Sequence, residues 1–100
     1  MVLARVVGNV VSTRKEPKIE GIRFLVLEKV NPETLKGLGD YVVAMDGVGA
    51  NIGEIVFYVA GSSARMTSVT EGRPADATIT AIVDAIDIRG EYVYHKDLSG

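Results

Sequence analysis

The sequence predicts an all-β domain, a small barrel or sandwich built from five or six short strands. Stretches rich in β-branched residues recur along the chain, and turn residues separate them at close intervals. No long segment repeats its apolar residues with the period of a helix, so a helix bundle is not expected. At this length, and without a linker or internal repeat, residues 1–100 are expected to form one domain.

The first two strands are expected at residues 2–12 and 22–30. Both faces of the first strand are largely apolar, which is typical of a strand that is covered on both sides. Gly8 interrupts this strand and indicates a bend or a bulge, as at the corner of a barrel. The charged segment that follows contains Pro17 and Gly21, and it is expected to be a solvated connection.

Further strands are expected at residues 41–45 and 54–60, followed by a long β-branched run at 78–88 and a last strand at 91–95. The turns between them carry two weak helix signals. Asn31 or Thr34 is placed to cap a single helical turn, and Ser62 or Ser63 is placed to cap a short helix.

Asp84 lies inside the apolar run 82–86, near the C-terminus. A carboxylate in such a run is expected either to face solvent at the edge of a strand or to be buried with a partner. Arg65 and Arg73 are candidate partners, from the same subunit or from another.

Composition argues against several classes of protein. The net charge is −2, so no strong field favours nucleic acid or an anionic membrane. The chain has no cysteine, which excludes disulfides, thiolate metal sites and a cysteine nucleophile. Neither a secretory signal peptide nor an apolar run long enough to span a bilayer is expected.

The glycine-rich segment 47–53 does not match a phosphate-binding loop. Gly47, Gly49 and Gly53 have the wrong spacing for a dinucleotide fingerprint, no Gly-Lys-Ser/Thr follows, and a strand is expected after them in place of a helix. The glycines instead predict a tight connection that needs positive φ or close approach to a neighbour.

Catalytic motifs are equally weak. The segment 61–65 contains serines but no nucleophile elbow, and His95 is the one histidine available as a base. No catalytic, cofactor-binding or metal-ligating residue is therefore expected, and no cofactor. His95 is more consistent with a surface or interface position at the end of a strand.

Six short segments keep a characteristic order and spacing: residues 4–15, 24–27, 44–54, 61–65, 73–76 and 81–84. Together they resemble the EutN/CcmL family of bacterial microcompartment vertex proteins along nearly the full chain. Three positions depart from the family pattern. Ile55 stands where an aromatic residue is frequent, Asn51 where glycine is common, and Ala75 where valine is frequent.

The resemblance implies a mainly all-β, small OB-like β-barrel with one or two short helices. It implies a homopentamer that caps the five-fold vertices of a polyhedral shell, with hexameric and trimeric shell proteins as partners. It implies no enzymatic activity, and a cytoplasmic location in the shell. Neither nucleic acid nor membrane is expected as a partner.

Two sets of residues are expected to carry assembly. The first set is expected at the subunit interface, where glycines let backbones approach and charged groups pair across subunits: Asp46, Gly47, Gly49, Gly53, Glu54, Ser62, Ser63, Arg65 and Asp84. The second set is expected on the outer rim, where the ring would meet hexamers: Arg14, Lys15, Lys18 and His95.

An OB-like module that binds nucleic acid or another ligand is the main alternative. Such a module needs a basic face with exposed aromatic residues, whereas this chain is nearly neutral and has four Tyr, two Phe and no Trp. A small enzyme is the second alternative, and a stoichiometric bound metal or cofactor would revive it.

Overall fold

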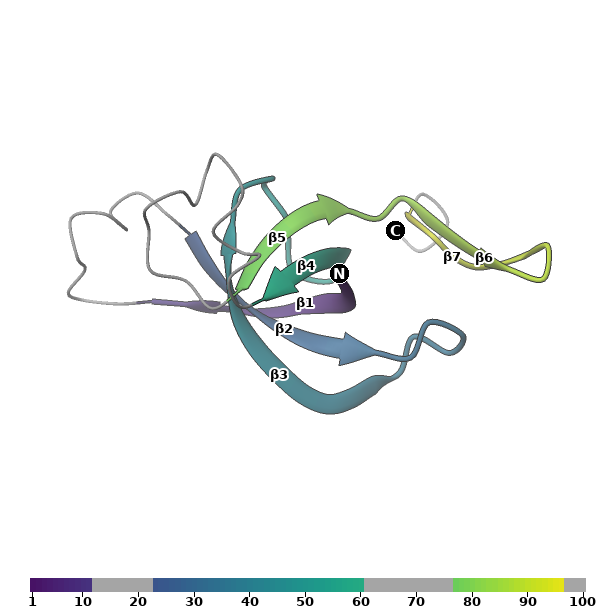
Figure 1. The fold of residues 1–100 in the computed structure, drawn as a ribbon, viewed down its shortest axis with the longest axis horizontal. Helices are drawn as coiled ribbons and strands as arrows, with labels where there is room; N and C mark the ends of the chain where they lie inside the picture. Colours follow the sequence, from purple (N-terminus) through teal and green to yellow (C-terminus); the bar gives the residue numbers. More distant parts are fainter. Residues whose placement is uncertain (12–22, 61–76, 97–100) are drawn as a thin grey trace.

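The computed structural model describes residues 1–11, 23–60 and 77–96. Its elements are seven strands, β1 (Val2–Val10), β2 (Arg23–Val30), β3 (Gly37–Asp46), β4 (Ile55–Ala60), β5 (Ala77–Ile82), β6 (Ala85–Ile88) and β7 (Glu91–His95). The first five form a closed barrel in the order β1-β2-β3-β5-β4, and β6 and β7 form a hairpin that extends away from it (Figure 1). The expected all-β barrel is confirmed. Within the ranges described, no helix is long and apolar enough to cross a membrane.

The barrel is held by a core of small and branched side chains from all five strands. Alternate residues of each strand point inward, as in any pleated sheet, and fill the interior. The buried members are Ala4, Val6, Leu25, Leu27, Ala44, Ala50, Val56, Tyr58, Ala77 and Ile79. A second cluster, Val30, Ile55, Val83 and Tyr94, packs the base of the β6–β7 hairpin against one end of the barrel.

The bend expected at Gly8 is present as a β-bulge. In the pairing of β1 with β2, Val6 lies opposite Leu27 and Gly8 lies opposite Val26, so Val7 is the extra residue. The bulge reverses which side chains of β1 point outward. Gly8 and Val10 thus join the outer surface of the barrel.

Strand β3 is longer than the predicted 41–45, because its two glycines lie within the strand and not in a loop. Gly37 pairs with Val30, and a Cβ at this position would collide with the carboxylate of Glu28. That carboxylate accepts a hydrogen bond from the amide of Gly39 at 3.0 Å, and Gly39 has a φ of 74°. The glycines therefore make room for a side chain that crosses from β2 to β3.

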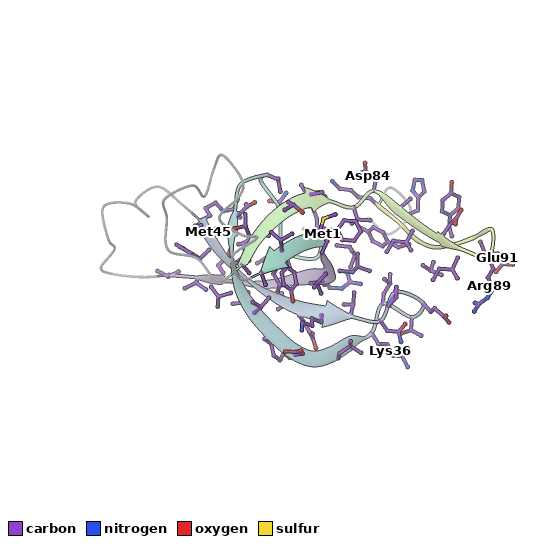
Figure 2. All side chains as sticks on the ribbon, viewed as in Figure 1. Met1, Lys36, Met45, Asp84, Arg89 and Glu91 are labelled. Atoms are coloured by element: carbon purple, nitrogen blue, oxygen red, sulfur yellow. The ribbon has the colours of Figure 1, made fainter. Side chains whose placement is uncertain are left out.

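The connection between β2 and β3 contains the single capped turn that the sequence predicts. The side-chain Oδ1 of Asn31 accepts the amide of Glu33 at 2.8 Å and, more weakly, that of Thr34 at 3.4 Å. Leu35 then adopts a left-handed φ of 59° and donates its amide to the Asn31 carbonyl at 2.7 Å. Asn31 therefore caps one turn, as its residue type predicts, and the left-handed Leu35 ends it before a longer helix forms. Lys36, which is labelled in Figure 2, marks the end of this turn just before β3.

The predicted run at 78–88 is divided into β5 and β6 by Val83 and Asp84. The amide of Val83 donates to the carbonyl of Ile55 at 2.8 Å, and its side chain is buried in the second cluster. The chain then leaves the barrel and enters the hairpin. The short helix predicted after Ser62 or Ser63 lies outside the described residues.

Candidate subunit interface

Asp46 organises the start of the glycine-rich loop between β3 and β4. Its side chain is 1% exposed, and its Oδ1 accepts the amides of Val48 and Gly49, each at 3.0 Å, while Oδ2 accepts that of Ala50 at 3.1 Å. Arg23 adds a second layer, with Nη1 3.4 Å from Oδ2 of Asp46 and Nη2 donating to the Ala50 carbonyl at 3.1 Å. One buried carboxylate therefore satisfies three amides of the loop.

Glu54 organises the other end of the same loop. Its Oε1 accepts the amide of Asn51 at 2.6 Å, and its Oε2 lies 2.6 Å from Nζ of Lys96, beyond the end of β7. Gly53 donates its amide to the Val6 carbonyl at 2.8 Å, and its own carbonyl accepts from Arg5 at 3.0 Å. Glu54 thus connects the loop to the C-terminal strand, and Gly53 connects it to β1.

The positive φ expected in this loop is found at two of its three glycines. Gly49 has a φ of 79° and Gly53 a φ of 94°, values that residues with a side chain rarely adopt. With the loop fixed in this way, Val48 and Ile52 are left exposed to solvent. The loop therefore presents two apolar side chains on a rigid support.

The Lys96 ammonium, and secondarily the Asn51 amide, hold the pKa of the Glu54 carboxyl below its ordinary value. The Glu54 carboxylate in turn raises the pKa of Lys96. Because the folded pKa of Glu54 lies below the unfolded one, the stabilisation is complete above the unfolded value near 4.5 and is lost as pH falls through the folded value.

A Glu54→Gln variant is expected to be less stable than the parent near neutral pH, and to converge with it in acid. The glutamine keeps the shape of the side chain but cannot gain stability from ionisation. Thermal unfolding from pH 7 to about pH 3, at one protein concentration, measures the difference. Lys96→Met should give the same trend, and parallel profiles for parent and variants would contradict the assignment.

Of the predicted site residues outside the loop from Asp46 to Glu54, Asp84 and His95 are described by the structure and the rest are not. Asp84 is exposed at the junction of β5 and β6, and its backbone carbonyl accepts the amide of Lys96 at 2.8 Å (Figure 2). His95 ends β7 and packs edge-to-face with Tyr92, with ring centroids 5.4 Å apart. Lys96 follows His95, which was predicted for the rim, and it contacts Glu54 and Asp84, which were predicted for the interface. The remaining predicted residues lie outside the described ranges: Ser62, Ser63, Arg65, Arg14, Lys15 and Lys18, together with the candidate partner Arg73.

One surface was not predicted residue by residue. Val26 lies between Gly8 of β1 and Val43 of β3, and Phe24 lies between Val10 and Met45. Leu25 and Leu27 point into the core, so Gly8, Val10, Phe24, Val26 and Val43 lie on the opposite, outer side, whereas Met45 at the end of the second row is fully buried. We call the surface of Gly8, Val10, Phe24, Val26 and Val43 the outer apolar face. Val10 is 39% exposed and Val43 47% exposed, and Tyr41, opposite Glu28, extends the face with 59% exposed.

The signal for this face was visible in the sequence as strands that are apolar in both phases of their alternation. The pairing register of β1, β2 and β3 and the bulge at Gly8 were needed to show that these outward residues form one continuous surface. When the interior of a barrel is already filled, an apolar patch on its outer surface is typical of a site that binds another molecule.

Comparison with known proteins agrees with this fold. The chain matches the family described as ethanolamine utilisation protein EutN/carboxysome over residues 1–84. The carboxysome shell vertex protein CcmL of Gloeobacter violaceus is 41% identical over 96 residues, covering 96% of this chain and 95% of the relative. The microcompartment shell vertex protein EutN of Escherichia coli is 35% identical over 96 residues, with 96% and 100% covered. The chain belongs to the EutN/CcmL family.

Solved structures support the same conclusion. The structure of Gloeobacter violaceus CcmL has a TM-score of 0.89 at 40% identity, covering 97% of this chain and 99% of the other. GrpN of Rhodospirillum rubrum, described as a pentameric microcompartment shell protein, has a TM-score of 0.78 at 38% identity, with 88% and 99% covered. The expected family is confirmed.

Proposed function

We propose that this chain, one domain of residues 1–100, is a structural shell protein whose homopentamers cap the five-fold vertices of a polyhedral bacterial microcompartment. The observation that carries the proposal is the likeness to vertex proteins over nearly the full chain, together with a TM-score of 0.78 to a structure described as pentameric. Hexameric and trimeric shell proteins would be its partners, and the shell would lie in the cytoplasm.

The function is geometric and requires no catalysis. A flat sheet of hexagonal units closes into a polyhedron only where pentagonal units take the corners. Each subunit of a ring presents one surface to one neighbour and a different surface to the other, and the rotation between them closes at five. A protein built for this purpose needs two rigid contact surfaces and apolar area left over after its own core is filled.

The loop from Asp46 to Glu54 is proposed as part of that contact. Asp46, Gly49, Gly53 and Glu54 would act indirectly, by fixing the backbone that presents exposed Val48 and Ile52 to a neighbour. Further proposed interface residues are Gly47, Ser62, Ser63, Arg65 and Asp84. The proposed rim residues are Arg14, Lys15, Lys18 and His95.

Native mass tests this proposal most directly. Five subunits of 10.7 kDa give a particle of about 54 kDa, which native mass spectrometry and light scattering distinguish from other ring sizes. We expect this mass at micromolar protein concentration. A stable monomer, or a ring with another number of copies, would contradict the proposal.

A further inference from the structure

The outer apolar face lies where OB barrels carry their ligands, on the face of strands 2 and 3. Its chemistry does not suit nucleic acid, because its centre consists of Val26 and Val43, flanked by Val10 and Phe24. Arg23, the neighbour of Phe24 in β2, is engaged by Asp46 and the Ala50 carbonyl. A phosphate backbone would meet aliphatic surface, and the carboxylate of Glu28 lies in the next row.

Gly8 follows the β-bulge of β1, a place where glycine is frequent, and it also shapes the outer apolar face. Its φ is not among the positive values of the described residues. A Cβ built there would lie 3.7 Å from Cβ of Val26, an ordinary van der Waals distance. Neither a positive φ nor crowding by the described residues therefore requires glycine at this position. The missing side chain does leave the outer surface of Val26 open to another chain.

A second copy of this chain is the occupant that fits. The centre of a protein–protein contact is depleted in charge and enriched in apolar and aromatic side chains, as this face is with Phe24 and Tyr41. A closed ring requires a contact surface of this kind on every subunit. Relatives at 38% and 34% identity, with TM-scores of 0.78 and 0.70, are described as pentameric shell proteins.

We infer that the outer apolar face is one half of the contact between neighbouring copies, with the neighbour's chain lying in the space that Gly8 leaves over Val26. The inference rests on the proposed ring. Beyond the proposed function, the inference names the surface of each subunit that is covered in the ring. The contact is heterologous, so the neighbour meets this face with a different part of its surface.

Single-cysteine labelling tests the inference, because the chain has no cysteine of its own. Val43→Cys and Val10→Cys place a thiol on the face, and Asp87→Cys places one on the exposed outer side of the hairpin as a control. Each variant is labelled with a small maleimide after its native mass is measured. In a five-copy particle, the thiols on the face are expected to react at least about tenfold more slowly than the control.

The outcomes separate the inference from the function on which it rests. Equal labelling rates at all three positions in a five-copy particle would overturn the inference and leave the ring intact. A one-subunit mass for the unmodified chain would overturn the proposed ring and the inference with it. Thiols on the face that are protected only after a single-stranded DNA oligonucleotide is added would overturn the inference in favour of a nucleic-acid surface.

Discussion

An Asp46→Ala variant is expected to lose about 3 kcal/mol of unfolding free energy per subunit. The substitution leaves the amides of Val48, Gly49 and Ala50 without the carboxylate that accepts them, and it removes the partner of Arg23. Each hydrogen bond to a charged group contributes about 1.5–3 kcal/mol, and three bonds to one side chain do not add fully. The shift in the midpoint of urea unfolding measures the loss.

Asp40→Ala is the matched control for this prediction. It removes a carboxylate of the same type from the same strand, but Asp40 is exposed and makes an ion pair with Lys29 at 3.0 Å. Exposed pairs of this kind contribute about 0–1 kcal/mol. Similar losses for the two variants would show that the loop does not depend on its buried carboxylate.

A Gly8→Lys variant is expected to fold and to lose the ring. Within the subunit, the Cβ finds ordinary contacts and the ammonium group extends into solvent from the outer face. Within the proposed contact, the charge would be buried among Val26 and Val43 without a partner. A penalty of about 3 kcal/mol per contact weakens each one about a hundredfold. Native mass and circular dichroism together measure assembly and folding.

Asp87→Lys is the control for added positive charge. It changes the net charge by one unit more than Gly8→Lys does, at an exposed position on the hairpin away from the outer apolar face. We expect it to remain assembled. A Gly8→Lys protein that still has the mass of five copies would contradict the placement of the neighbour over Val26.

The strands and the bulge were predictable because they depend on local patterns. β-branched runs, turn residues and a glycine within a strand report their own backbone preferences, and these agreed with the barrel. Gly37 and Gly39 fell outside the predicted strand at 41–45 because their role depends on Glu28, which is separated from them in sequence and adjacent in the sheet. The division of the run at Val83 likewise depends on a contact with Ile55 on another strand.

In the candidate site too, the sequence pattern indicated which residues matter, whereas their contacts with other strands became visible only in the structure. The sequence marked Asp46 and Glu54 as important, but it could not show that their carboxylates are satisfied by loop amides and by Lys96. The outer apolar face depends on the register of three strands, which one sequence does not specify. All of the interface and rim residues, within the described ranges and outside them, remain predictions.

The short parallel pairing between β3 and β5 bears on how the subunit folds. These strands meet only at Met45 with Thr78 and at Asp46 with Ile79, while residues 47–77 lie between them in the chain. β1, β2 and β3 are consecutive antiparallel strands, so they pair at a smaller loss of chain entropy than this seam, which joins residues separated by a longer stretch of chain that includes β4. We therefore expect the closure of this seam to be a concentration-independent step that precedes contact between subunits.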